Sequence, residues 1–418
     1  MKGLGMIGAV LGIAGQCMGW GTPHGAISRA AWDALPVAYQ AQWGKEADAF
    51  ARVYCIYPDS VYTSTDAVHY CQLPWRKTDR YVTTLHLPGD PQENYAIVRH
   101  LVGRITAAWR NGQPSEAARY SGVLAHAIED WSCPAHVTVE DNMFTLFQQY
   151  LPPPETEAGK LLHSPLEGAA FTVDITRYQP VQLGTSDDAI AFTLLWHIQH
   201  GTVFARQQLV PMIEAWYRAD VERVADMQRK AAEYGARLVA DMLFSTQSLG
   251  CEKIEREQDS GVVMTSLFPL EAPQLYFPQR AFFSKPYWGY PLINGHMKSG
   301  EGKVALALQH EGRRVVVEGI GVGTASQLSY FLPCDLYQRF QAMVGLHADL
   351  GAECAVTFSV FGNAALLKQV DVSGCSNAVM IDVPLRGVTN VQLRVRAQGK
   401  HPGTGNYAVW GNPRLLRD

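Results

Sequence analysis

The stretch "LAHAIEDWSCPAH", Leu124–His136, decides how the first part of this chain is interpreted. His126 and Asp130 are four residues apart, so a helix places both side chains on one face, one turn apart. Pro134 cannot continue that helix, because proline lacks a backbone donor and restricts the residue before it. His136 can therefore turn back toward the same cavity. Two imidazoles and a carboxylate in this arrangement indicate a metal site.

On both sides of this stretch, apolar residues recur every three or four positions, which predicts helices. The runs with this pattern are residues 25–35, 93–110, 116–131, 187–209 and 213–244. Consecutive prolines in "LPPP", residues 151–154, predict a loop between the third and fourth runs. We therefore expect residues 20–250 to form an all-helical domain.

The sequence pattern changes after about residue 249, where short β-rich runs alternate with Gly, Asn and Asp. Examples are "AECAVTFSVFG", "AVMIDVPL" and "NVQLRVRAQG", a pattern typical of an antiparallel sandwich. We expect residues 251–283 to be a linker and residues 284–418 to form an all-β sandwich domain.

The first nineteen residues combine one lysine, an apolar run and small residues, which predicts a signal peptide and a secreted protein. Seven cysteines follow the signal, and Cys55 with Cys71 could form a disulfide around a short segment. The net charge of −4 argues against a general polyanion binder, so no stable nucleic-acid complex is expected.

Three other stretches supply candidate metal ligands. "HSPLE" repeats the four-residue spacing with His163 and Glu167, "YPDSVYTSTDAVHYC" contains Asp59 and His69, and "WGTPHG" places His24 four residues after Trp20. Neutral histidines and ionised carboxylates are the forms that bind zinc.

Together these motifs resemble the bacterial zinc-dependent phospholipase C family, whose superfamily includes the single-strand-specific zinc nucleases. The resemblance covers about residues 20–249 and implies an all-helical domain with three zinc ions per chain. The ligands that it implies are Trp20, His24, Asp59, His69, His126, Asp130, His136, His163 and Glu167. Asp130 would bridge two ions, and Asp59 would also act as the base toward the attacking water. Asp66 remains an alternative to Asp59, and His197 with His200 an alternative to the second zinc pair.

Zinc acidifies bound water and neutralises phosphate oxygens, so the resemblance implies a secreted phosphodiesterase of the phospholipase C type, acting on phospholipid at a membrane surface. Two alternatives stay open, a single-strand-specific nuclease and a glycan-binding surface protein with a non-catalytic metal domain. From about Pro286, the stretches Val317–Leu346, "VTFSVFGNAALLK" and "YAVWGNPRLL" resemble the NPCBM type of galactose-binding-like jelly roll. That resemblance implies a possible glycan partner.

Overall fold

The computed structural model describes residues 23–75, 91–136, 171–254, 261–267, 292–293, 296–299, 302–323, 326–374, 376–398 and 407–417. The predicted signal peptide, Trp20, His163 and Glu167 lie outside these residues. The chain divides into two compact units, each described here by itself. The first comprises Met1–Pro88, His100–Leu183 and His197–Lys253, and the second comprises Gly89–Arg99, Gly184–Trp196 and Ile254–Asp418.

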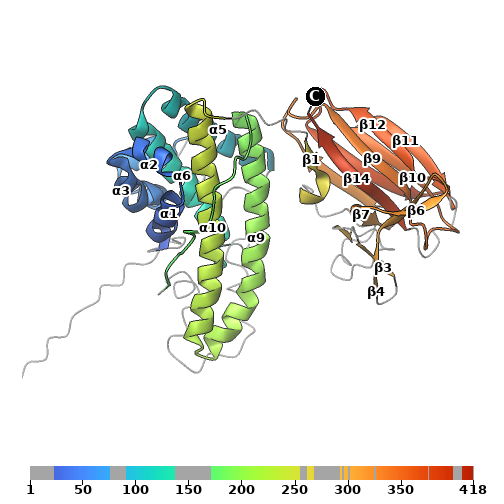
Figure 1. Ribbon diagram of the computed structural model, residues 1–418, viewed down its shortest axis with the longest axis horizontal. Coiled ribbons are helices and arrows are strands. Elements are labelled where there is room, and N and C mark those ends of the chain that lie inside the picture. Colours follow the sequence, from blue (N-terminus) through green and yellow to red (C-terminus); the bar gives the residue numbers. More distant parts are fainter. Residues whose placement is uncertain are drawn as a thin grey trace, which may run out of the picture. The chain divides into compact units, whose positions relative to one another are not determined.

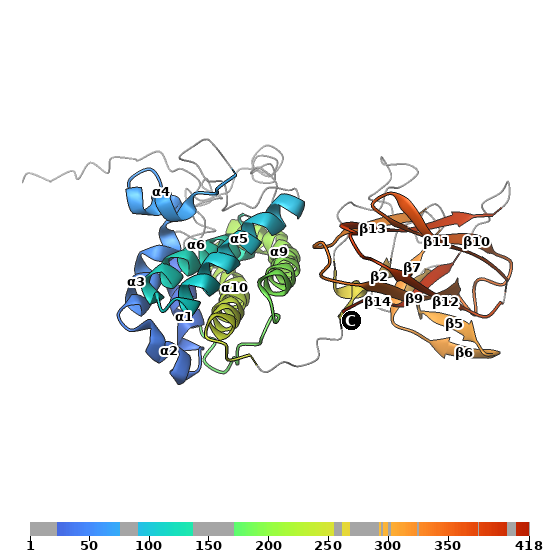
Figure 2. The same cartoon turned by 90° about the horizontal axis from the view of Figure 1, so that it is seen from above.

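Helices make up the N-terminal part of the chain (Figures 1 and 2). They are α1 (Pro23–Asp33), α2 (Val37–Trp43), α3 (Glu46–Arg52), α4 (Thr65–Cys71), α5 (Pro91–Arg110), α6 (Pro114–Ser132), α9 (Asp187–Tyr217) and α10 (Val221–Gly250), with the short 3-10 helices η1 (Tyr54–Ile56) and η2 (Pro58–Ser60). The prediction of a helical part followed by a β-sandwich is confirmed. Among the described helices, none has the length and apolar composition that a membrane span requires.

The two longest helices, α9 and α10, are separated at a point where the sequence predicted one continuous helix. The run at residues 213–244 was expected to be one helix, but α9 ends at Tyr217 and α10 begins at Val221. Ala219 adopts the left-handed conformation, with φ 55°, and Asp220 caps α10 by accepting a hydrogen bond from the backbone N–H of Arg223 at 3.1 Å. Phe204 stacks on Tyr234 with ring centroids 5.4 Å apart, which holds the two helices together.

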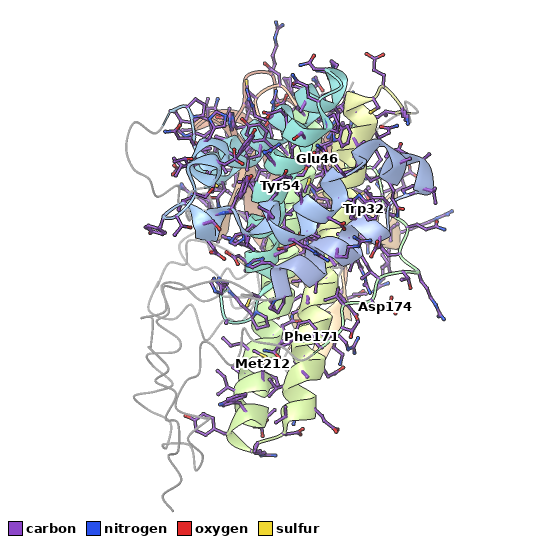
Figure 3. All side chains as sticks on the ribbon, turned by 90° about the vertical axis from the view of Figure 1, so that its left-hand side faces the viewer. Trp32, Glu46, Tyr54, Phe171, Asp174 and Met212 are labelled. Carbon is purple, nitrogen blue, oxygen red and sulfur yellow. The ribbon has the colours of Figure 1, made fainter. Side chains whose placement is uncertain are left out.

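Helix α6 is the centre of the helical unit, because it contacts α1, α3, α10 and η1. It approaches η1 so closely that a Cβ on Gly122 would lie 2.4 Å from the carbonyl carbon of Tyr54. The Tyr54 hydroxyl donates to Glu46 Oε2 at 2.9 Å, which ties η1 to α3 (Figure 3). The absence of a side chain at Gly122 therefore fixes the position of the segment that follows Tyr54.

The segment Phe171–Leu183 is attached to α10 by hydrogen bonds. Asp241 accepts from the Tyr178 hydroxyl at 2.8 and 2.9 Å and from the Val181 N–H at 2.8 Å. Ser245 Oγ accepts from the Leu183 N–H at 2.8 Å. Burial raises the pKa of Asp241 to about 6, although the hydrogen bonds from Val181 and Tyr178 oppose that shift.

The second unit contains a two-layer sandwich. One sheet has the order β12-β9-β14-β7-β2, with β1 also paired to β14, and the other has the order β11-β10-β13-β8. Strand bounds are β1 Val262–Val263, β2 Leu292–Ile293, β7 Gly319–Val322, β8 Ser326–Phe331, β9 Arg339–Leu346, β10 Ala355–Gly362, β11 Ala365–Ser373, β12 Val379–Pro384, β13 Asn390–Ala397 and β14 Ala408–Leu416. Two hairpins, β3–β4 (His296–Ser299, Gly302–Ala305) and β5–β6 (Ala307–His310, Arg313–Val316), complete the strands. Trp410 is fully buried between the layers, where its ring meets Phe358 edge-on at 5.1 Å.

Two further predictions need correction, one at the start of the second unit and one in the first unit. The segment 251–283 was expected to be a linker, but Val262 and Val263 pair with Leu415 and Arg414, and Met264 beside them is buried in the sandwich core. The possible disulfide between Cys55 and Cys71 does not form, since both residues are buried free thiols.

Candidate metal centre

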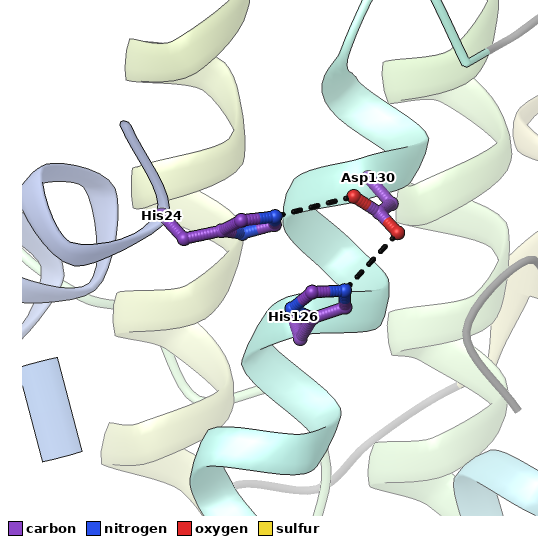
Figure 4. Close-up of side chains that lie close together, drawn as sticks. All are labelled: His24, His126 and Asp130. Carbon is purple, nitrogen blue, oxygen red and sulfur yellow. Dashed lines mark ion pairs between the residues drawn. The ribbon is translucent and has the colours of Figure 1, made fainter. Parts of the chain in front are cut away.

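Three side chains from two helices converge in the interior of the helical unit. His24 comes from α1, and His126 and Asp130 come from α6 (Figure 4). All three are buried, with 0%, 1% and 0% of their surface exposed. Their candidate ligand atoms lie within 4.8 Å of one another.

The local sequence explains how these groups meet. His24 lies on the buried face of α1 together with Ile27, Ser28 and Ala31, which recur at helical spacing. His126 and Asp130 are one turn apart on α6, as their spacing predicts. The two imidazole rings stack almost in parallel, with centroids 4.1 Å apart and an interplanar angle of 14°.

Each imidazole is held through its Nδ1 atom. Nδ1 of His24 contacts Glu129 Oε2 at 2.5 Å, and Nδ1 of His126 contacts the Cys55 carbonyl oxygen at 2.7 Å. A carbonyl oxygen and an ionised carboxylate only accept hydrogen bonds, so each Nδ1 must carry the proton. Both Nε2 atoms face Asp130, and each can act as a metal donor when it carries no proton.

The distances around Asp130 suit a cation. Nε2 of His24 lies 3.4 Å from Asp130 Oδ1, and Nε2 of His126 lies 3.3 Å from Asp130 Oδ2. Two ligands held at about 2.0–2.1 Å by one tetrahedral zinc lie about 3.3 Å apart, so these separations match. Nε2 of His24 is buried and makes no hydrogen bond within the described residues. Lone pairs that face a carboxylate need a proton or a metal ion between them, and this donor set fits zinc.

Buried carboxylates dominate the electrostatics of this cluster. Burial by itself lowers the pKa of His24, but polar interactions with Asp130 and Glu129 outweigh it and raise that pKa to about 10. Burial likewise opposes ionisation of Asp130, but the charges of His126 and His136 hold its pKa well below the usual value. The carboxylate is therefore ionised, and cations are attracted to it.

Asp59, not its alternative Asp66, lies beside the trio of His24, His126 and Asp130. Asp59 Oδ1 is 3.6 Å from His126 Nε2, and the side chain is 17% exposed. Asp66 instead accepts from the Tyr57 hydroxyl and pairs with Arg119. Among the carboxylates of the Tyr57–Cys71 segment, Asp59 therefore has the position that a ligand or base needs.

The remaining predicted ligands vary in position. His136 lies three residues after Cys133, the C-cap of α6, whose backbone is extended because Pro134 follows it. The charge of His136 lowers the pKa of Asp130. His69 is exposed on α4, where its ring meets Tyr70 edge-on at 4.9 Å, and it is not in the cluster of described candidate ligands. His197 and His200 lie half-buried on α9, and burial lowers the pKa of His197 to about 4.

Sequence reasoning missed the groups that hold the imidazoles. Glu129 and Ser28 are both buried, and the Ser28 hydroxyl donates to Glu129 Oε1 at 2.7 Å. A signal was available, because Glu129 lies in a helix in which Leu124, Ala125 and Ile128 are all apolar. A carboxylate with such neighbours needs a buried partner.

The comparisons with known proteins concern mainly the second unit. Residues 290–416 match the NPCBM/NEW2 domain family. The C-terminal part of this chain is an NPCBM domain. Its sandwich is similar to a solved structure of CBM51 from Clostridium perfringens GH95 in complex with methyl-galactose. That similarity has 20% identity and a TM-score of 0.31, and it covers 38% of this chain and 100% of the other.

Two further solved structures cover nearly the whole chain. The alpha toxin from Clostridium absonum is 12% identical with a TM-score of 0.30, and covers 97% of this chain and 100% of its own. The alpha-toxin of a Clostridium perfringens avian strain is 10% identical with a TM-score of 0.30, and covers 96% of this chain and 100% of its own. No curated protein matches the sequence. The chain is a helical region followed by a β-sandwich that matches the NPCBM/NEW2 domain family.

Proposed function

We propose that this protein is a zinc-dependent phosphoric diester hydrolase of the phospholipase C type. The observation that carries the proposal is the buried set of two imidazoles that are held at Nδ1 and whose Nε2 atoms face the Asp130 carboxylate. The ordered ligand motifs of the sequence support the same interpretation. Zinc bound there would supply a hydroxide at neutral pH and neutralise the charge of the phosphodiester.

The chain's own residues would divide the work. His24, His126 and Asp130 would hold the metal, since one Asp130 oxygen lies beside the Nε2 atom of each histidine. Asp59 is partly exposed and near His126, so it can accept a proton from an attacking water at the edge of the centre. Trp20, His69, His136, His163 and Glu167 are proposed to complete three zinc sites.

The substrate class is tested with two phosphodiesters. The mature protein, loaded with zinc, is incubated with phosphatidylcholine vesicles and separately with single-stranded DNA, and phosphocholine release and DNA cleavage are measured. We expect phosphocholine release, which a chelator abolishes and zinc restores. DNA cleavage alone would establish the nuclease alternative, and less than one zinc per chain after loading would refute the metal centre.

We further propose that the NPCBM domain binds a glycan on the surface where the exported enzyme acts. The domain match supports this second function. It is tested with the complete chain on a glycan array that includes galactosides. Retention on a glycan that free sugar reverses is the expected result, and no retention on any sugar would leave the domain a purely structural role.

A further inference from the structure

Glu129 occupies an unusual position beside the trio. It is fully buried on α6, next in sequence to the equally buried Asp130. One carboxylate oxygen accepts from the Ser28 hydroxyl at 2.7 Å, and the other contacts His24 Nδ1 at 2.5 Å. Ser28 follows His24 by one turn of α1, so both donors approach Glu129 from one helix face.

Burying a second carboxylate next to Asp130 is costly, because an ionised group loses its hydration and the two negative charges repel. A side chain that only packed α6 against α1 would not need a charge there. The contact with His24 Nδ1 accounts for the charge of Glu129. It fixes the orientation of the imidazole ring, so that His24 Nε2 lies 3.4 Å from Asp130 Oδ1.

The two imidazoles are held by acceptors of different strength. His126 donates to the neutral Cys55 carbonyl at 2.7 Å, whereas His24 donates to a carboxylate at 2.5 Å. A charged acceptor shares more of the Nδ1 proton and makes Nε2 a stronger metal donor. The two histidines are therefore unequal, and the difference comes from residue 129.

We propose that Glu129 is a positioning residue that, with Ser28, orients His24 and strengthens it as a metal donor. The inference rests on the proposed zinc centre. It assigns to α6 two neighbouring carboxylates with separate roles, Asp130 facing the metal and Glu129 facing the back of one ligand. Removing Glu129 should weaken metal binding without removing any group that touches the metal.

The test compares two substitutions at one position. Glu129→Gln keeps an oxygen that can accept from His24 Nδ1, while its amide can donate to Ser28, so it removes the charge and keeps the orientation. Glu129→Met keeps the length but accepts no hydrogen bond. Zinc affinity, measured by competition with a chromophoric chelator, should fall about 10-fold for Gln and about 100-fold for Met.

The matched control is Glu116→Gln, on the same helix. Glu116 accepts from the Tyr70 hydroxyl and has no contact with the trio among the described residues. It should leave zinc affinity within about twofold of wild type. Ser28→Ala, a milder change, should give a smaller loss than Glu129→Gln.

A readout that packing alone would not change is the visible spectrum of the cobalt-substituted protein, which reports the ligand field. The spectrum should shift in both Glu129 variants and stay unchanged in Glu116→Gln. Equal zinc affinity and identical cobalt spectra in wild type and the Glu129 variants would overturn the role of Glu129. If wild type itself bound neither metal, the proposed zinc centre would fail instead, so the two failures are distinguishable.

Discussion

Gly122→Ala tests the link between helix packing and the metal centre. A Cβ at this position would lie 2.4 Å from the Tyr54 carbonyl carbon and 2.6 Å from its oxygen, whereas ordinary contacts begin at 3.4 Å. The obstructing atoms are mainly backbone and cannot rotate away. Helix α6 and η1 must therefore separate by about 1 Å, and overpacking of this kind costs about 1–3 kcal/mol.

The intrinsic preference of helices works in the opposite direction, because alanine in a helix interior is favoured over glycine by about 1 kcal/mol. We expect the packing cost to exceed this gain, so the variant should lose about 1–2 kcal/mol of unfolding free energy. The same separation would stretch the 2.7 Å contact between His126 Nδ1 and the Cys55 carbonyl. Zinc affinity should then fall about 10-fold or more.

Urea unfolding in the presence of a chelator gives the stability change, and chelator competition gives the zinc affinity. The control is Ser121→Ala on the neighbouring residue, whose buried hydroxyl has no hydrogen-bond partner in the described part of the chain, so its loss should cost little. A Gly122→Ala protein that is more stable than wild type and binds zinc equally well would show that α6 does not lie this close to η1.

Three other variants probe separate parts of the structure. Asp130→Asn should lower the zinc content per chain well below that of wild type, whereas His197→Ala should keep the wild-type zinc content, as elemental analysis would show. Similar zinc content in both variants would contradict the assignment. The pKa of Asp241 is about 6 in the folded protein and about 3.9 in the unfolded chain, so the protonated form favours folding. The unfolding free energy of wild type should therefore fall by up to about 3 kcal/mol from about pH 4 to pH 6. Asp241→Asn should remove that dependence in urea unfolding, and an unchanged pH profile would contradict it. Trp410→Ala should cost about 3–5 kcal/mol in thermal unfolding of the sandwich, because it empties the space between the two sheets, and a shift below 1 kcal/mol would be inconsistent with its burial.

Local periodicity predicted most helices and the His126–Asp130 pair, because four-residue spacing has a fixed meaning in a helix. It could not predict the break at Ala219, where neither glycine nor proline marks the left-handed residue and only the capping Asp220 gives a signal. Strand β1 was missed for another reason. It is two residues long and pairs with Leu415, about 150 positions away, so no local pattern reveals it.

Within the candidate site, sequence motifs pointed to His24, His126 and Asp130, but the groups that hold the two imidazoles could not be found in this way. The Cys55 carbonyl that orients His126 belongs to the backbone, so side-chain chemistry gives no sign of it. Glu129 belongs to the stretch Leu124–His136, but its role depends on which helix packs against α6 at that position. The residues of that helix, α1, that contact Glu129 lie more than 100 positions earlier, and only the tertiary packing brings them there.

In the proposed zinc centre, the buried charges would couple metal binding to folding. Glu129 and Asp130 bring two negative charges into a site with no exposed surface, and an uncompensated buried charge destabilises a fold strongly. In the metal-free protein the raised pKa of His24 supplies compensation through protonation. A divalent cation can replace that proton while both imidazoles stay neutral and bind through Nε2. The same burial that would otherwise destabilise α6 therefore makes the centre selective for a cation, and the stability of the helical unit should increase with zinc concentration.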